Sequence, residues 1–314
     1  MTKLGASDLD VFPLCLGGNV FGWTADRDQS FAVLDAFAAA GGNFIDTADT
    51  YSAWVPGNTG GESEAIIGEW MAARGNRERI VVATKAGKDQ PLTAANVRAK
   101  AEASLERLRS DHIDVYYIHY DDPNTPLEET LGTFDALVRE GKVRHVAASN
   151  FSAPRLAEAL AVSDREGFAR FVALQPEYSL VERGYERELR DVVAREGLGC
   201  LPYWSLAMGF LTGKYRPGAP EGSSPRAQGA AKYLDERGIA VLGALDEVAA
   251  AHDTTVAAVA LAWLLAQPTV TAPIASARTT EQLADLLPLA GLELAAGEVE
   301  RLTAASEPAG AAAS

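Results

Sequence analysis

Short apolar segments alternate with longer amphipathic segments eight times along the chain. Two of the short segments, residues 80–85 and 113–119, are largely apolar on both faces, which is typical of buried parallel strands. In the longer segments, such as residues 94–108, apolar side chains recur at helical spacing, and glycines follow where a helix should end. The pattern predicts strands at residues 14–17, 43–46, 80–85, 113–119, 143–149, 172–175, 199–203 and 269–274.

Eight strand–helix units predict an α/β fold, a single (β/α)8 TIM barrel over residues 1–314. We expect residues 3–11 to form a β-hairpin that closes the bottom of the barrel, opposite the end where such barrels place their active sites. Residues 216–229, rich in Pro, Gly and Ser, should form a mobile loop over the site, and residues 304–314 a frayed tail. A doubly wound sheet is the alternative, but residues 17–22 lack the GxGxxG spacing that usually follows its first strand.

The composition argues against several classes of partner. A formal net charge of −15 repels nucleic acid and anionic membrane surfaces. No segment approaches the roughly 20 apolar residues that span a bilayer, and we find no signal-peptide core, so we expect a cytoplasmic protein. The two cysteines, Cys15 and Cys200, lie in short apolar runs and should be buried thiols. Together with four scattered histidines they offer no cluster for a metal ion.

Polar side chains stand at the ends of several predicted strands. Asp46, Lys85 and His119 each end a strand, and Tyr51 lies in the loop after Asp46. Each has an ordinary structural explanation, since Asp46 could cap a turn, Lys85 could extend to solvent, and His119 could be a core histidine. Because the carboxyl ends of the strands meet at one end of a barrel, we expect the four side chains to lie together.

Such a group could donate a proton to an oxygen that gains charge as hydride reaches a carbonyl carbon. Tyrosine is a weak acid with a pKa of about 10, and we expect the ammonium of Lys85 to lower the pKa of Tyr51. Asp46 would keep Lys85 charged and oriented, and His119 would polarise the carbonyl oxygen. None of the four supplies hydride, which must come from a cofactor.

The segments that carry these residues resemble the signature motifs of the aldo-keto reductases. Residues 42–52 (GNFIDTADTYS) and 61–68 (GESEAIIG) are similar to the first signature of that family. The similarity continues in order through residues 82–85 (VATK), 114–119 (DVYYIH), 148–151 (ASNF), 175–178 (QPEY) and 209–215 (GFLTGKY). It implies an NADPH-dependent carbonyl reductase with Tyr51 as the proton donor and the other three residues in the roles given above.

The resemblance also implies a site for the nicotinamide end of the cofactor. Ser149, Asn150 and Gln175 would hold the carboxamide, and Tyr203 would stack on the ring. The alternatives are a helix cap for Ser149 and Asn150, a backbone contact for Gln175, and core packing for Tyr203.

The phosphates and the adenosine would be held by residues after the last two strands. Arg278 can offer a fork of donors to a 2′-phosphate, which favours NADPH over NADH, and the alternative is a solvated arginine at a helix start. Trp204, Ser205, Ala275 and Leu286 depart from residues that are common in the family at these positions. The residues implied are Ser205, Leu206, Gly209 and Lys214 along the pyrophosphate, and Ser276, Arg278 and Gln282 at the ribose and 2′-phosphate.

Three aromatic residues follow predicted strands one, two and four, namely Trp23, Trp54 and Tyr120. They would form the walls of a substrate pocket that suits aryl or alkyl aldehydes and some ketones. Packing at the rim of the barrel is the alternative.

Two other functions remain open. A redox-sensing module that binds the cofactor, as channel-associated relatives of the family do, would turn over aldehydes very slowly and carry an apolar docking surface. A barrel isomerase or lyase would use Lys85 to form a Schiff base, which needs a desolvated amine, and Asp46 argues against that by keeping Lys85 protonated. The physiological substrate, the direction of reaction and the oligomeric state are not specified by the pattern.

Overall fold

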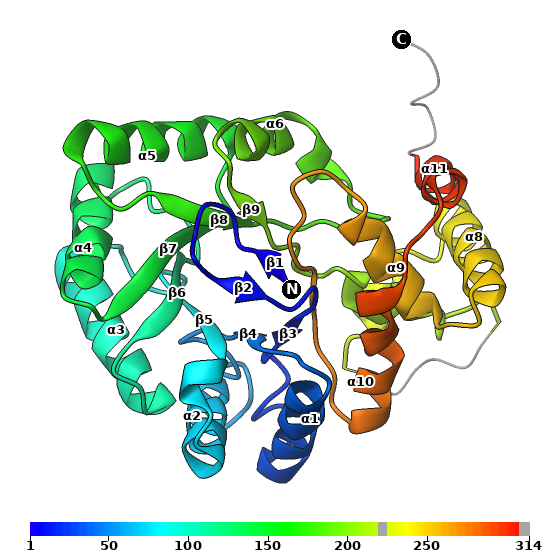
Figure 1. Ribbon diagram of the computed structural model, residues 1–314, viewed down its shortest axis with the longest axis horizontal. Helices are drawn as coiled ribbons and strands as arrows, with labels where there is room; N and C mark the ends of the chain where they lie inside the picture. The colour runs from blue at the N-terminus through cyan, green and yellow to red at the C-terminus, as the bar shows by residue number, and fades with distance from the viewer. Residues whose placement is uncertain (219–224, 308–314) are drawn as a thin grey trace.

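The computed structural model describes residues 1–218 and 225–307, and it is a (β/α)8 barrel. Eight parallel strands follow one another around the barrel, with helices on the outside (Figure 1). The strands are β3 (Cys15–Gly17), β4 (Phe44–Asp46), β5 (Val81–Ala86), β6 (Ile113–Ile118), β7 (Val143–Ser149), β8 (Phe171–Gln175), β9 (Gly199–Cys200) and β10 (Ile274–Ala275). The helices are α1 (Arg27–Ala39), α2 (Glu62–Arg74), α3 (Ala94–Leu108), α4 (Leu127–Arg139), α5 (Ala153–Glu166), α6 (Glu188–Arg195), α7 (Ala227–Ala231), α8 (Glu236–Ala251), α9 (Val256–Leu265), α10 (Thr280–Leu286) and α11 (Ala296–Ala305).

The barrel closes through the segment predicted as the eighth strand. Its second half, β10, pairs with β3 through the register Ile274 to Cys15. On its other side the segment contacts β9 and the residues after it: Val270 forms an isolated parallel bridge with Cys200, and the backbone N–H of Ile274 donates to the backbone oxygen of Pro202 at 2.8 Å. The continuous strand predicted over residues 269–274 is wrong in its extent, because only Ile274–Ala275 form a regular strand.

The helices begin and end where side-chain chemistry favours it. In α3, the Thr93 side chain accepts a hydrogen bond from the backbone N–H of Asn96, and Arg109 ends the helix in the left-handed conformation. Apolar side chains of α3 such as Val97 and Leu105 are buried. The outer apolar faces of the strands meet such helix faces, so the core is a layer between sheet and helices together with a filled barrel interior.

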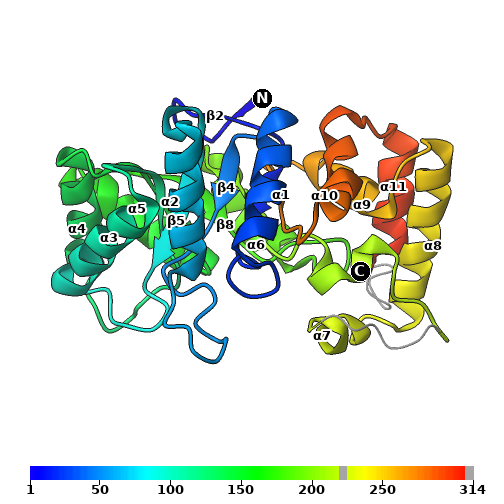
Figure 2. The same cartoon turned by 90° about the horizontal axis from the view of Figure 1, so that it is seen from below.

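A hairpin closes the amino-terminal end of the barrel, as predicted. It consists of β1 (Thr2–Lys3) and β2 (Asp10–Val11), which pair antiparallel and lie across the centre of the barrel in Figure 1. Leu4 and Leu9 from its turn belong to the apolar cluster that fills the barrel interior. In Figure 2 the hairpin and α7 lie at opposite ends of the molecule. The hairpin covers the amino-terminal end of the barrel, so the end where α7 lies is the one available to ligands.

Two predictions about irregular segments need correction. The loop expected at 216–229 extends into a helix, because α7 begins at Ala227, while residues 219–224 lie outside the described part of the chain. The frayed tail expected from residue 304 is wrong for its first residues, which complete α11. Ser306 is fully buried and accepts a hydrogen bond from Arg183 Nη1 at 3.1 Å, and residues 308–314 are not described.

Cys15 and Cys200 are buried free thiols, as predicted. Within residues 1–218 and 225–307, no single helix is long and apolar enough to cross a membrane. Helices α8 and α9 reach the required length and composition only as a pair, and that pair is bent by 97°.

The contact between α2 and α3 generates a prediction about stability. A Cβ atom on Gly68 would lie 2.2 Å from the backbone oxygen of Arg107, so Gly68→Ala should force the helices apart and lower the free energy of unfolding by about 1–3 kcal/mol. Gly243 in α8 is the control, because it is exposed and a Cβ there meets nothing within 4 Å. Gly243→Ala should stabilise by up to about 1 kcal/mol in the same urea titration. Equal effects of the two substitutions would contradict the close approach.

Candidate active site

Asp46 and Lys85 form a buried ion pair at the carboxyl ends of β4 and β5. Asp46 pairs with Ala83 in the parallel ladder, so Lys85, two residues further along β5, points to the same side of the sheet. Lys85 Nζ donates to Asp46 Oδ2 at 2.7 Å and to the backbone oxygen of Thr47 at 2.7 Å. The two side chains are 0% and 2% exposed, so each charge depends on the other for compensation.

The Tyr51 hydroxyl contacts both members of this pair. It accepts a hydrogen bond from Lys85 Nζ at 2.9 Å and donates one to Asp46 Oδ2 at 3.2 Å. Burial and the negative charge of Asp46 raise the pKa of Tyr51 well above its ordinary value, while burial lowers the pKa of Lys85 against the opposing effect of Asp46. The predicted lowering of the Tyr51 pKa is therefore wrong here, because desolvation of the phenolate outweighs the nearby ammonium.

His119 follows β6 and faces Tyr51, with ring centroids 6.3 Å apart. Burial, together with the charges of Lys85 and Lys88, lowers the pKa of His119 from 6.5 to about 2, so the ring is neutral at physiological pH. Its Nδ1 atom is buried and has no hydrogen-bond partner among the described residues. Because an N–H at Nδ1 would lack an acceptor, we infer that the single ring proton is on Nε2.

Polar side chains at the carboxyl ends of β7, β8 and β9 extend this network. Gln175 Nε2 donates to Asp46 Oδ1 at 2.8 Å, which ties β8 to the ion pair. Asn150 has a left-handed backbone, with φ of 57°, and its Nδ2 donates to the backbone oxygen of His119 at 2.9 Å. The Tyr203 hydroxyl donates to Asn150 Oδ1 at 2.9 Å. The amide side chains are thus fixed in position at the same end of the barrel.

Ser149 and Asn150 do not cap the following helix. The cap of α5 is Ser152, whose side chain accepts from the backbone N–H of Arg155. Ser149 Oγ instead donates to the backbone oxygen of Gln175 at 2.8 Å. The helix-cap alternative for Ser149 and Asn150 is therefore wrong.

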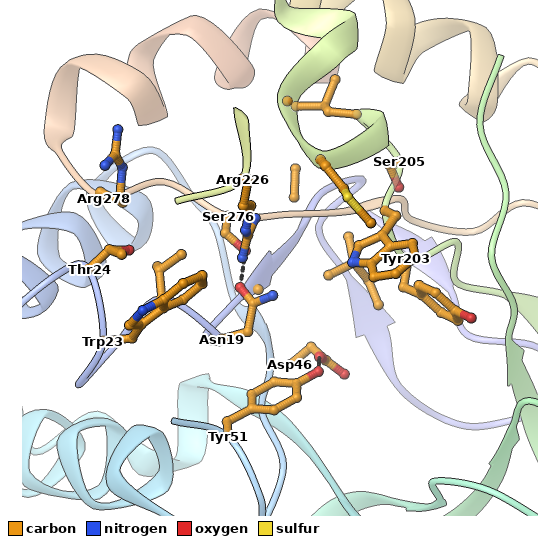
Figure 3. Close-up of a pocket in the computed structure, with 18 of the residues that line it drawn as sticks. Asn19, Trp23, Thr24, Asp46, Tyr51, Tyr203, Ser205, Arg226, Ser276 and Arg278 are labelled. Carbon is orange, nitrogen blue, oxygen red and sulfur yellow. Dashed lines mark hydrogen bonds between the residues drawn. The ribbon is translucent and has the colours of Figure 1, made fainter. Parts of the chain in front are cut away.

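These side chains surround a cavity of about 860 Å³ at the carboxyl end of the barrel (Figure 3). Figure 3 shows Tyr51 beside Asp46, with Arg278 well apart from both. Lys85 lies behind the wall that Tyr51 and Asp46 form. The other predicted site residues all line the cavity: Trp23, Asp46, Tyr51, Trp54, His119, Tyr120, Ser149, Asn150, Gln175, Tyr203, Ser205, Leu206, Gly209, Lys214, Ser276, Arg278 and Gln282.

The segment after β9 has an unusual backbone where it borders the cavity. Trp204, Ala207 and Met208 have φ values of 51°, 47° and 57°, the left-handed conformation that non-glycine residues rarely adopt. Such conformations persist only where the surroundings hold them, and they gather at ligand sites. Ser205 is buried, and its Oγ donates to the backbone oxygen of Pro202 at 2.8 Å. This segment therefore borders the cavity with a fixed backbone.

The segment after β10 holds Arg278 at the cavity wall. Ser276 Oγ donates to Asn19 Oδ1 at 2.7 Å, which joins this segment to the loop after β3 (Figure 3). Gln282 Oε1 accepts from the backbone N–H of Arg278 at 2.9 Å. The Arg278 guanidinium forms no salt bridge with any residue of 1–218 or 225–307, so its charge is available to a ligand.

A model of the Aldo/keto reductase family matches residues 13–307. This chain belongs to the aldo/keto reductase family. The match covers the whole barrel and every residue of the cavity described above, so the site belongs to an oxidoreductase.

Individual relatives of this aldo/keto reductase agree with that assignment. It is 37% identical to YrpG of Bacillus subtilis, an uncharacterized oxidoreductase, over 91% of this chain and 89% of the relative. It is 34% identical to the norsolorinic acid reductase stcV of Emericella nidulans, over 92% and 76% of the two chains. It is 31% identical to the aryl-alcohol dehydrogenase GME11368 of Pestalotiopsis microspora, over 95% and 79%.

Members of the family generally use a nicotinamide cofactor, and the cavity of this aldo/keto reductase fits one. Its volume of about 860 Å³ lies within the range of cofactor pockets. Lys214 and Arg278 line it without a salt bridge to any described residue, which suits the phosphates of a dinucleotide. A Cβ on Gly209 would lie 3.3 Å from Lys214 Nζ, so the absence of a side chain there leaves room beside that cation. When bound, the cofactor would contribute hydride chemistry.

Among the polar residues of this cavity that sequence reasoning missed are Asn19, Lys88 and Arg226. The guanidinium of Arg226 lies 5.4 Å from the centre of the Trp23 ring. Asn19 had a usable signal, since it lies just after the first strand, near the end where Asp46 closes the second. Arg226 lies in a stretch without apolar periodicity, which gave no indication of where its side chain would point.

We predict that His119 makes the stability of this aldo/keto reductase sensitive to acid. Below pH 6.5 His119 binds a proton in the unfolded chain, whereas the folded ring stays neutral down to a pH of about 2. Proton binding therefore favours the unfolded state, and the free energy of unfolding should decrease as the pH falls from 6.5 toward 2. Between about pH 8 and pH 5 the wild type should lose about 2 kcal/mol more unfolding free energy than His119→Gln. Urea titrations at the two pH values measure the difference. Equal losses would mean that the folded His119 titrates normally.

Proposed function

We propose that this chain reduces aldehydes and ketones with NADPH and that Tyr51 donates the proton to the carbonyl oxygen. The observation that carries the proposal is the contact of the Tyr51 hydroxyl with both Lys85 Nζ and Asp46 Oδ2 at the wall of the cavity. Membership of the aldo/keto reductase family supports carbonyl chemistry in that cavity. Bound NADPH would supply the hydride.

Tyr51 begins the step as a protonated acid, because its pKa is raised by burial and by Asp46. Its hydroxyl turns from Asp46 toward a carbonyl oxygen in the cavity and gives up the proton there. Lys85 Nζ, at 2.9 Å, stays hydrogen-bonded to the phenolate oxygen and compensates the charge that remains. Asp46 is held from its other side by Gln175, so the ammonium stays oriented throughout.

His119 acts on the same carbonyl oxygen as a neutral donor. Its pKa of about 2 keeps the ring uncharged, and a proton on Nε2 can be donated as a hydrogen bond to the substrate oxygen. A neutral imidazole polarises the carbonyl without competing with Tyr51 as the acid. The two residues thereby have separate roles, orientation for His119 and proton transfer for Tyr51.

Aromatic walls indicate an aryl substituent on the substrate. Trp23 and Trp54 contact each other edge to face with ring centroids 5.5 Å apart, and Tyr120 stacks on His119 at 5.1 Å. Aromatic side chains that line the cavity beside Tyr51 and His119 favour a planar ring. The relative named aryl-alcohol dehydrogenase supports the same class of substrate.

Loss of the Tyr51 hydroxyl should remove turnover and leave cofactor binding intact. Tyr51→Phe should lower kcat for a panel of aromatic and aliphatic aldehydes by about 10²–10⁴-fold, the usual contribution of a general acid. Oxidation of NADPH, followed by its absorbance, measures the rate, and fluorescence titration measures NADPH binding. Tyr116→Phe is the control, because the Tyr116 hydroxyl is buried away from the cavity and has no partner among the described residues.

Wild-type turnover in Tyr51→Phe would contradict the assignment of the proton donor. Tight NADPH binding by the wild type with no turnover of any carbonyl would instead favour a redox-sensing module.

Arg278 should determine the preference for NADPH. Arg278→Gln should raise the Kd for NADPH about tenfold and leave the Kd for NADH nearly unchanged, because only NADPH carries the 2′-phosphate. Arg301→Gln is the matched control, since Arg301 is exposed on α11 and pairs with Glu247 at 2.8 Å. Equal weakening of the two cofactors by Arg278→Gln would exclude a 2′-phosphate contact.

A further inference from the structure

Lys88 is a cation in the part of the cavity where the substrate would react. It follows β5, three residues after Lys85, and lines the cavity together with Tyr51, His119 and Tyr120. Its ammonium is close enough to His119 to contribute to the lowered pKa of that ring. Neither the family resemblance nor the proposed mechanism gives Lys88 a role.

The charge of Lys88 has no partner within the described part of the chain. Lys88 forms no salt bridge there, whereas Lys100, the next lysine in the sequence, pairs with buried Asp49 at 3.0 Å. On the adjacent loop after β6, Asp121 pairs with Arg155 at 2.9 Å. The Lys88 ammonium is therefore available to a ligand.

The other acid on that loop, Asp122, is also engaged. Its carboxylate accepts hydrogen bonds from the backbone N–H groups of Leu92 and Asn124 and from Thr125 Oγ1. These bonds lower the pKa of Asp122 and use its lone pairs locally. The Asp122 carboxylate thus stabilises the loop and does not compensate the charge of Lys88.

The balance of charge in the cavity differs from that of the whole chain. The net charge of −15 would repel an anion at long range, but charges further away than about 8–10 Å are largely screened at physiological salt. Among the described residues, two carboxylates line the cavity, and one of them, Asp46, is neutralised by Lys85. The other, Asp285, lies on α10, the helix that follows the segment carrying Arg278. The reacting end of the cavity is therefore locally positive.

Exposed aromatic faces flank this positive end. Trp54 is 45% exposed and Tyr120 is 42% exposed, and both line the cavity. Large aromatic side chains left this open at a cavity mouth are covered when a planar ligand binds. An aromatic ligand that packs on them would place its ring substituents near Lys88.

We propose that Lys88 makes this enzyme selective for aromatic aldehydes or ketones that carry an anionic group, such as a carboxylate. The inference rests on the proposed function, whose step is unchanged. Bound NADPH would supply the hydride for the carbonyl carbon, Tyr51 would supply the proton for the oxygen, and the products would be an alcohol and NADP⁺. Lys88 binds the anionic substituent and determines specificity without taking part in proton transfer.

The test compares two pairs of aldehydes that differ in charge and are nearly equal in shape: 4-formylbenzoate with 4-formylbenzamide, and the 3-formyl isomers of both. Values of kcat and KM are measured for wild type, Lys88→Met and Lys88→Arg. Lys142→Met is the control, because it removes the same charge at the residue before β7, at the opposite end of the barrel, where Lys142 pairs with Glu102.

Wild type should prefer the formylbenzoate of at least one pair. Lys88→Met should reduce that preference about tenfold, through a higher KM for the anion, because the charged contact exists before and during the reaction. Lys88→Arg keeps the positive charge and should retain the preference for the formylbenzoate, as should Lys142→Met. Two outcomes would overturn the inference: a preference for the formylbenzoate that survives in Lys88→Met, or no such preference in wild type. In either case, turnover of the formylbenzamides would still uphold the proposed function. Failure to reduce any of the four aldehydes would overturn both.

Discussion

A lysine and an aspartate removed from water at the end of the barrel place the strongest constraint on this structure. Neither charge of the Lys85–Asp46 pair is tolerable without the other, and each also needs its remaining hydrogen bonds satisfied. The backbone of Thr47 and the side chains of Tyr51 and Gln175 meet that need. Because these groups come from β4, β8 and the loop after β4, the pair also fixes how those elements sit around β5.

The outer face of β5 is held by a second ion pair, whose carboxylate is buried. Glu64 of α2 is fully buried, accepts a hydrogen bond from Thr84 Oγ1 at 2.6 Å, and pairs with Arg107 of α3 at 2.6 Å. Thr84 is the neighbour of Lys85 on the strand, so the same short stretch is fixed from inside and outside the barrel. The position of Lys85 is thus determined by contacts on both faces of β5.

Sequence patterns predicted most of the fold because apolar strands and amphipathic helices alternate with clear stops, and α3 was predicted at its observed bounds. Asp46, Lys85 and His119 were expected at one place for a topological reason, since parallel strands end together. The short extent of the last strand, Ile274–Ala275, depends on its pairing with distant parts of the chain, which local pattern does not encode. The raised pKa of Tyr51 depends on burial, and the position of Arg226 depends on tertiary packing. Neither could therefore be predicted from the sequence pattern.

The way the barrel closes has a consequence for how the chain acquires its structure. Most strand pairs join segments that are close in sequence, as β5 joins β6, but Ile274 pairs with Cys15 across almost the full length of the chain. Forming that last pair carries the loop-closure entropy of nearly the whole polypeptide. During synthesis one edge of β3 therefore stays unpaired until the final quarter of the chain has been made. In that interval the nascent chain is most prone to aggregate through the unpaired edge.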